Sequence, residues 1–340
     1  MHLVGFLPSV NTRWRERSDG HRVMGQDDQG VGRRGERSTV TITPLVDRVS
    51  PSFFIIQQSG DLLSTTTGHI DFIKSLLVIP HLQLLVSGSS DKTISLWSLT
   101  SAHTPSTPLT RLHVLKSHTR PVDSFVLFKP VRADQASFFS GDSMGVIRRW
   151  EVVRRGGGDT VEVKQQGPDL PGHHTSITRL LLDGDNTGLY SCSMDSQILY
   201  HPLSESVASS STTTDLKPAL TIPHPLYPET TAIRSILLLP PTFHPQPLLL
   251  AGSSDEDIRA YDISTTLETA SRSYTAQQIK SGPTGRSKEV SRVQGHWADV
   301  IDLDVWVKDV EGGKKEAWVV SASLDETLRR WSMAGESIVR

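Results

Sequence analysis

Histidine, serine and aspartate recur together in this chain at spacings that could do chemistry. His69, Ser87 and Asp91 form one such set, and a second set with the same residue types begins at His296. A histidine that is oriented by an aspartate can activate a serine hydroxyl, as in serine hydrolases. The adjacent pair His173 and His174 could contribute to a metal site, but no third ligand stands at a metal-binding spacing. The chain therefore raises hypotheses of catalysis and of metal binding.

The wider sequence weighs against both hypotheses, because the same residues return at a repeat period. A turn, an apolar stretch and a strand that ends on an aromatic residue recur at 68–97, 117–150, 172–201, 228–261 and 295–331. Six residues separate the turn acid from the closing aromatic residue in three copies, as in Asp91 and Trp97. Self-similarity of this kind indicates a repeat architecture. A set that recurs with the repeat and ends on an indole is expected to be structural, so we predict no enzyme activity and no metal site.

Each repeat has the pattern of a β-meander. Aliphatic stretches such as 84–86 and 318–320 run into small hydroxyl residues, and a turn at an aspartate leads into an alternating strand such as 93–97. No stretch has helical spacing. Short strands that are buried on both faces cannot bury themselves alone and must stack on similar neighbours. The pattern predicts an all-β propeller.

The segments GH…SGSSDKTISLW at 68–97 and GH…SASLDETLRRW at 295–331 resemble WD40 repeats. The resemblance covers about 68–331. It implies a WD40-like β-propeller with five recognisable repeats and an N-terminal partial blade, six or seven blades in all. In that family a hydrogen-bond chain runs from the Trp indole through Ser and His to the turn Asp and ties each blade together. The complete structural tetrads here are His69, Ser87, Asp91 and Trp97, and His296, Ser321, Asp325 and Trp331.

The other three copies match this pattern only in part. The second copy lacks the turn aspartate, because Met144 occupies its position, and the third has His201 in place of the tryptophan. The fourth copy has Glu229 at the histidine position, Ala251 at the serine position and Tyr261 as its closing residue. That copy is supported by its AGSSD segment and its strand spacing alone.

The region before the first full repeat divides into two parts. Residues 1–38 hold seven arginines, five acids and many glycines, which predicts a flexible N-terminal segment or a long loop. Residues 39–340 are assigned to the propeller. Asp47 stands six residues before Phe53, so this stretch is predicted to be the end of another blade. Its inner strands would come from residues 39–45 and from the apolar start of the chain, residues 1–10. Polar insertions are expected at 204–215 and 265–292.

Composition narrows the functional classes. The 340 residues carry 35 Lys and Arg against 37 Asp and Glu, a formal charge of −2, so there is no overall field that would attract nucleic acid. No run is long enough for a membrane span, and the single cysteine, Cys192, cannot form an intramolecular disulfide. Phosphate-binding and hydrolase motifs are missing. We expect no cofactor, no small-molecule substrate, no membrane association and an intracellular location in the cytoplasm, the nucleus or both.

Family resemblance implies that partners bind at the face formed by the turns that carry His and Asp. Trp297 is the sharpest candidate, because tryptophan is enriched at binding hot spots; the alternative is that it packs against the adjacent blade. The candidate partner-binding residues are Asp71, Arg120, Thr175 and Trp297 from the first turn, and Ser90, Ser143, Met194, Ser254 and Leu324 from the second.

These observations predict a non-catalytic scaffold that docks protein partners or peptides, as part of a multiprotein complex. One alternative is an accessory or substrate-receptor subunit of an enzyme complex, such as a ubiquitin ligase or an RNA-modifying enzyme. A closing strand with a WDxR ending would favour the ligase version, and none is present. Another alternative is a nucleic-acid-associated propeller that uses the Arg-rich N-terminus. The arginine pairs at 148–149 and 329–330 are expected to cover strand edges rather than bind nucleic acid.

Overall fold

A computed structural model describes residues 40–44, 52–57, 62–100, 107–128, 132–155, 158–170, 172–184, 186–203, 218, 220–226, 231–239, 247–264, 288–310, 314–334 and 337–339. Strands account for almost all of the regular structure in those residues, beside a short 3-10 turn, η1 (Pro80–Leu82). They form one three-stranded sheet and five four-stranded sheets, with every pairing antiparallel. The all-β prediction is confirmed.

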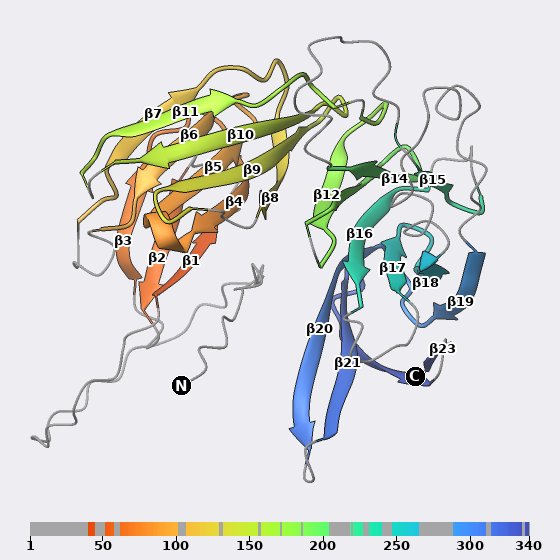
Figure 1. Ribbon diagram of the computed structural model, residues 1–340. Helices are drawn as coiled ribbons and strands as arrows, with labels where there is room; N and C mark the ends of the chain where they lie inside the picture. The colour runs from red at the N-terminus through yellow and green to blue at the C-terminus, as the bar shows by residue number, and fades with distance from the viewer. Residues whose placement is uncertain are drawn as a thin grey trace, which may run out of the picture.

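Each sheet is assembled from strands that follow one another in the sequence (Figure 1). The three-stranded sheet contains β1 (Val40–Pro44), β2 (Ser52–Gln57) and β3 (Leu62–Thr67). The next two contain β4 (Ile73–Ile79), β5 (Leu84–Ser89), β6 (Ile94–Ser98) and β7 (Arg111–Leu115), then β8 (Val122–Phe128), β9 (Gln135–Asp142), β10 (Ile147–Arg154) and β11 (Val161–Gln165). The last three contain β12 (Ile177–Leu182), β13 (Gly188–Ser193), β14 (Gln197–Pro202) and β15 (Leu220–Pro223), then β16 (Ile233–Leu238), β17 (Leu248–Ser253), β18 (Asp257–Asp262) and β19 (Lys288–Gln294), and finally β20 (Val300–Val310), β21 (Lys314–Ser323), β22 (Leu328–Ala334) and β23 (Ser337–Val339).

The tight turn between the second and third strands has the same backbone form in all five four-stranded sheets. The residue after the turn aspartate takes a positive φ, as at Lys92 and Glu326, which is the left-handed region. In the β8–β11 sheet the equivalent residue is Gly145, which follows Met144. The turn register inferred from the sequence therefore holds even where the aspartate is missing.

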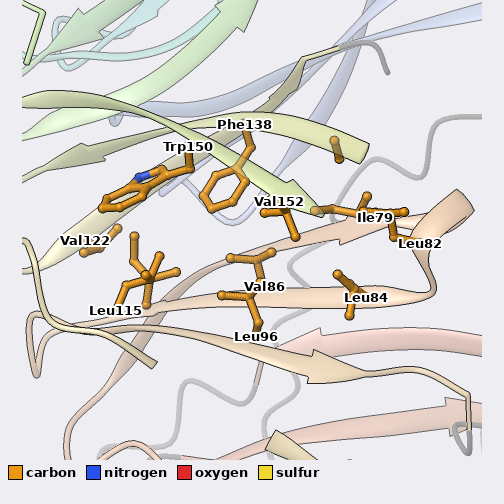
Figure 2. Close-up of a cluster of buried hydrophobic side chains, with 12 residues drawn as sticks. Ile79, Leu82, Leu84, Val86, Leu96, Leu115, Val122, Phe138, Trp150 and Val152 are labelled. Atoms are coloured by element: carbon orange, nitrogen blue, oxygen red, sulfur yellow. The ribbon is translucent and has the colours of Figure 1, made fainter. Parts of the chain in front are cut away.

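Stacked sheets bury the core between them. The first strands of the four-stranded sheets pack in sequence, β4 on β8, β8 on β12, β12 on β16 and β16 on β20. Figure 2 shows the cluster between the β4–β7 and β8–β11 sheets, where Val86 and Leu96 meet Val122, Phe138 and Trp150. Burying one such side chain contributes about 1.5–3 kcal/mol. A sheet whose two faces are both apolar is stable only between two neighbours, which is the propeller arrangement that the sequence predicts.

The boundaries differ from the sequence predictions in two places. Residues 288–292 belong to β19, although we expected them to be part of a polar insertion, because Val290 and Val293 pack into the core there. The partial blade before Gly68 is the β1–β3 sheet. The segment 1–38, the apolar start and the insertion at 204–215 lie outside the described residues. The number of blades, six or seven, stays a prediction.

Candidate functional site

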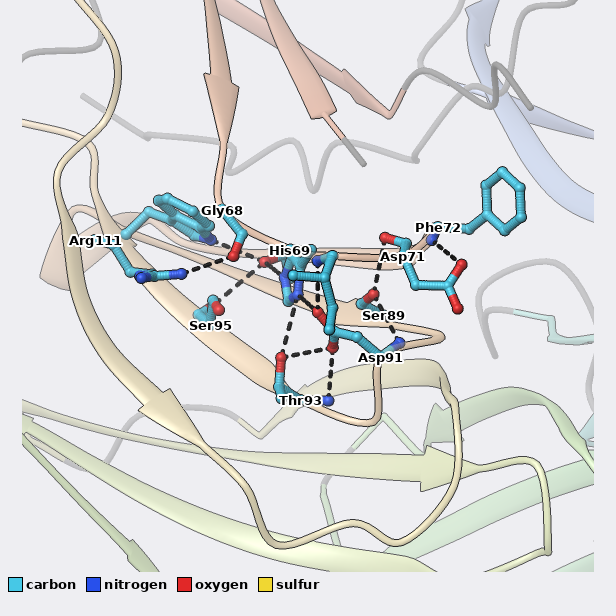
Figure 3. Close-up of polar contacts among 12 residues, drawn as sticks. Gly68, His69, Asp71, Phe72, Ser89, Asp91, Thr93, Ser95 and Arg111 are labelled. Carbon is cyan, nitrogen blue, oxygen red and sulfur yellow. Dashed lines mark hydrogen bonds and ion pairs between the residues drawn. The ribbon is translucent and has the colours of Figure 1, made fainter. Parts of the chain in front are cut away.

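The β4–β7 sheet contains a continuous chain of buried hydrogen bonds (Figure 3). The Nδ1 atom of His69 donates to Asp91 Oδ2 at 2.8 Å, its Nε2 lies 2.7 Å from Ser87 Oγ, and the Trp97 indole donates to the same oxygen at 2.8 Å. Burial lowers the pKa of His69 below its usual value, against the opposing effect of Asp91, so the ring is neutral and Nε2 can accept from the serine. Each polar atom of the set thus satisfies the next one.

The β20–β23 sheet has the same chain. His296 Nδ1 lies 2.8 Å from Asp325 Oδ2, and its Nε2 lies 2.6 Å from Ser321 Oγ, which accepts from the Trp331 indole at 2.8 Å. Burial alone would raise the pKa of Asp325, but hydrogen bonds from Thr327 and His296 outweigh it and hold that pKa well below its usual range. The structure brings all eight predicted tetrad residues into contact.

The β8–β11 sheet completes its tetrad with a residue that the sequence analysis missed. His118 Nε2 lies 2.7 Å from Ser140 Oγ, and its Nδ1 donates at 2.9 Å to Asp142. The turn aspartate is absent, as the sequence predicts, but the expectation that the tetrad is therefore incomplete is wrong. Asp142 ends strand β9, two residues after the serine, and its carboxylate reaches the histidine from the strand instead of from the turn. It also accepts from the backbone N–H of Met144 at 2.9 Å.

The β12–β15 sheet has only part of the chain. His173 Nδ1 lies 3.0 Å from Asp195 Oδ1, and its Nε2 lies 2.9 Å from Ser191 Oγ. His201 stands where the other sheets have tryptophan; it is fully buried, and its Nε2 has no hydrogen-bond partner among the described residues. Burial lowers the pKa of His201 to about 3, with a smaller contribution from His173, so this ring is neutral as well.

The β16–β19 sheet replaces the chain with buried charges. His224 Nε2, directly after β15, lies 3.3 Å from Asp255 Oδ2, so a histidine reaches the turn aspartate here. Glu229, which the sequence analysis puts at the histidine position, lies outside the described residues, so that placement stays a prediction. The guanidinium of Arg259 donates to both Asp255 oxygens at 2.9 and 2.6 Å and to Asp257 at 2.8 Å. Burial alone would raise the pKa of Asp255, but hydrogen bonds from His224 and Arg259 hold it far below its usual range.

The tetrad serines are not arranged for nucleophilic attack. Ser87, Ser140, Ser191 and Ser321 are all completely buried, and three of them accept a hydrogen bond from an indole. A substrate carbonyl could not reach such a hydroxyl. Within the described residues no group of three or more His, Cys, Asp or Glu side chains is arranged to hold a metal ion, and no described helix is long and apolar enough to cross a membrane.

The two turns that carry the candidate partner-binding residues lie side by side in every four-stranded sheet. One backbone hydrogen bond of 2.8–3.1 Å joins them each time. The second-turn residue donates its N–H to a first-turn carbonyl, in the pairs Ser90 to Phe72, Ser143 to Pro121, Met194 to Ser176, Ser254 to Ala232 and Leu324 to Asp299. The nine candidate residues therefore lie in turns at the same end of the strands in successive sheets.

The turns at this end of the sheets carry a set of exposed apolar side chains. Trp297 is 70% exposed and Leu324 is 54% exposed, so Trp297 is not packed against a neighbouring sheet of the described residues. Asp71, Arg120 and Thr175 are exposed, while Ser90, Ser143 and Ser254 are half-buried. The sequence analysis missed three further apolar residues in these turns, although their turn positions were readable. We define the docking face as Ile70, Phe72, Met144, Met194, Trp297 and Leu324.

The buried tetrads hold this face in place. In three sheets the aspartate that accepts the hydrogen bond from the histidine also accepts one from the backbone N–H of the residue that follows the histidine. These N–H groups belong to Ile70 at 3.1 Å, His174 at 3.0 Å and Trp297 at 3.4 Å. These are the exposed residues of the first turn. The interior hydrogen bonds thus fix the backbone from which the exposed side chains project.

The arginine pairs are engaged in packing. Arg148 donates to both carboxylate oxygens of Asp169 at 2.9 Å, and Arg149 lies over the ring of Phe128 at 5.0 Å. Arg330 lies 4.3 Å from the centroid of the Trp318 ring. These contacts occupy the guanidinium groups with partners inside the chain, as expected for arginines that cover a strand edge.

Comparison with known proteins agrees with this geometry. The family model "WD domain, G-beta repeat" matches residues 60–98 and 164–201. An uncharacterized WD repeat-containing protein of Schizosaccharomyces pombe is 22% identical over 276 residues, which is 81% of this chain and 58% of that protein. The transcriptional repressor tup12 of the same yeast is 43% identical over 17% of the chain and 9% of its own length. Pre-mRNA-processing factor 19 of Oryza sativa is 38% identical over 19% of the chain and 12% of its own length.

The chain therefore contains WD40 repeats, and its four-stranded sheets are blades of a WD40-type β-propeller. It spans 58% of the length of the first of these relatives and a far smaller share of the others.

Proposed function

We propose that this propeller is a non-catalytic scaffold that docks partner proteins or peptides on the docking face. The observation that carries the proposal is the grouping of exposed apolar side chains on turns whose backbones are fixed from below. The set includes Trp297, and tryptophan is a residue type enriched at binding hot spots. Because the turns are held by buried hydrogen bonds, binding costs little ordering entropy.

The relatives support the same class of role. The names of two of them describe a transcriptional repressor and a pre-mRNA-processing factor. The one cysteine, Cys192, is free and buried, which suits a reducing compartment and supports an intracellular location. The alternative of an accessory subunit is one version of this proposal, and the identity of the partner distinguishes it.

Affinity purification of the tagged chain, followed by mass spectrometry, tests the proposal. We expect a stoichiometric partner with the unaltered chain, and its loss in a Trp297→Ala, Arg120→Ala double variant with an unchanged melting temperature. Trp306→Ala is the matched control, because Trp306 is also exposed but lies on strand β20 outside the turns. Recovery of the same partner with both variants would rule out the docking face. Nucleic-acid binding would instead appear as affinity that falls steeply with salt and is lost on deletion of residues 1–38.

A further inference from the structure

Each four-stranded sheet except the last is covered by the sheet that follows it. The third strand of each contributes an isoleucine that is 0–1% exposed and packs in one cluster with the first residue of the next inner strand. These pairs are Ile94 with Val122, Ile147 with Ile177, Ile198 with Ile233, and Ile258 with Val300. The contact is so close that a Cβ on Gly88, Gly141 or Gly252 would collide with the covering side chain.

The β20–β23 sheet has no such cover. Leu328 pairs with Ala322 across the strands in the register in which Ile94 pairs with Gly88, so it occupies the same place in the sheet. Yet Leu328 is 76% exposed, and Trp306, at the place of the fully buried Ile79, is 47% exposed. We call this surface the uncovered face: Trp306, Trp318, Val320, Leu328 and Arg330.

Among the described residues the β1–β3 sheet has one strand fewer than the other sheets, and the missing strand is the innermost one. In the other sheets the strand that leads directly into the next turn histidine is the outermost, as β7 is before His118. Strand β3 leads into His69, so β3 is outermost and β1 is the second strand. In agreement, β1 packs against β4 as the second strands β5 and β9 pack against β8 and β12.

One absent inner strand explains both features, because inner strands are what cover the isoleucine position elsewhere. We infer that the apolar segment Leu3–Leu7 (LVGFL) of this chain supplies that strand, pairing with β1 and covering Leu328 on the uncovered face. The segment lies outside the described residues and is the main apolar run among the 39 residues that precede β1. Its five residues compare with the six or seven residues of the innermost strands β4, β8, β12 and β16.

The connection between this segment and β1 permits the docking. About 32 residues separate them, and an extended chain of that length reaches roughly 100 Å. Loop closure becomes costlier only slowly with length, by about 0.6 kcal/mol per doubling, and a tether raises the effective concentration to the millimolar range. The polar, Arg-rich stretch between them would then serve as the linker. This inference does not depend on the docking face.

Thiol labelling of a Leu328→Cys variant tests the inference directly. The native Cys192 is fully buried and should not react, so the new thiol reports alone. We expect labelling by a maleimide to be at least tenfold faster after deletion of residues 1–10 than in the full chain. Leu324→Cys, on the exposed neighbouring turn, should label equally fast in both. A full-length Phe6→Asp variant, which disrupts the apolar strand without truncation, should label like the deletion and serves if the truncated chain misfolds.

Three results would overturn the inference. Equally fast labelling of Leu328→Cys with and without residues 1–10 would mean that nothing covers the face in the full chain. Slow labelling that persists after the deletion would mean that another part of the chain does. Slow labelling confined to a dimeric fraction on size-exclusion chromatography would assign the strand to a second copy of the chain.

Discussion

The β4–β7 and β16–β19 sheets have the same strand order and the same turn geometry but opposite interior chemistry. In the first, a neutral chain of His69, Ser87 and Trp97 ends on Asp91. In the second, Ala251 stands at the serine position and Arg259 is clamped between two aspartates. Both sheets keep the backbone hydrogen bond between their two turns. Both chemistries bring buried polar groups together under the turns, although Asp257 Oδ1 and Arg259 Nε in the second sheet have no hydrogen-bond partner among the described residues.

The largest effect is expected from removing the charge that the second sheet depends on. Arg259→Met would leave Asp255 without its bidentate partner and the buried Asp257 with Arg292 as its remaining cation, which costs about 3–5 kcal/mol. Urea unfolding, followed by tryptophan fluorescence, measures the loss. Arg111→Met is the matched control in the β4–β7 sheet, because Arg111 is exposed and donates to one carbonyl, that of Gly68; it should cost less than about 1 kcal/mol. A loss below 1 kcal/mol for Arg259→Met would show that the aspartates are hydrated.

A smaller effect is expected from breaking the neutral chain at its centre. Ser87→Ala removes the oxygen shared by the His69 ring and the Trp97 indole, and the loss of these two buried hydrogen bonds costs about 3 kcal/mol together. Ser75→Ala in the same sheet is the control, since the Ser75 hydroxyl is buried without a partner among the described residues. That variant should change stability by no more than about 0.5 kcal/mol. Equal losses in both variants would contradict a role for the chain in stability.

Much of this comparison was readable from the sequence. Fixed spacing between serine, aspartate and tryptophan predicts the tetrads of the β4–β7 and β20–β23 sheets, because strand length and turn type leave the side chains one possible meeting point. Asp142 escaped that logic, since its carboxylate reaches His118 from the strand end, where spacing from the turn gives no signal. His224 escaped it because extra residues separate it from β16. The exposure of Trp297 and Leu328 depends on neighbouring sheets, which local spacing does not encode.

The β12–β15 sheet keeps the His–Ser–Asp part of the chain but has the buried His201 in place of tryptophan. We expect its contribution to stability to be the most sensitive to acid. The unfolded chain binds a proton at His201 below about pH 6.5, whereas the folded chain does so only near pH 3. Stability should therefore fall with decreasing pH through this window, by about 1.4 kcal/mol per unit, or about 2 kcal/mol between pH 6.5 and 5. Comparing unfolding free energies across this range for the native chain and a His201→Gln variant isolates the contribution.

The control for this pH dependence is the neighbouring exposed histidine. A His174→Gln variant should keep the slope of the native chain, while His201→Gln should flatten it. An unchanged slope in His201→Gln would mean that His201 is protonated in the folded protein and that burial does not exclude the proton.

The smallest effect on stability is expected from Met144→Asp, although the sequence pattern suggests that this substitution would complete the tetrad. Met144→Asp restores the turn aspartate of the β8–β11 sheet, yet Asp142 already accepts from His118 at 2.9 Å and from the Met144 N–H. A second carboxylate gains no donor and adds like charge, so stability should change by no more than about 0.5 kcal/mol. Asp142→Ala alone should cost about 1–3 kcal/mol, and adding Met144→Asp to it should recover part of the loss, measured by thermal unfolding. A gain above 1 kcal/mol from Met144→Asp alone would mean that the strand-end carboxylate does not replace the turn aspartate, and that the blade depends on where the acid stands as well as on what it binds.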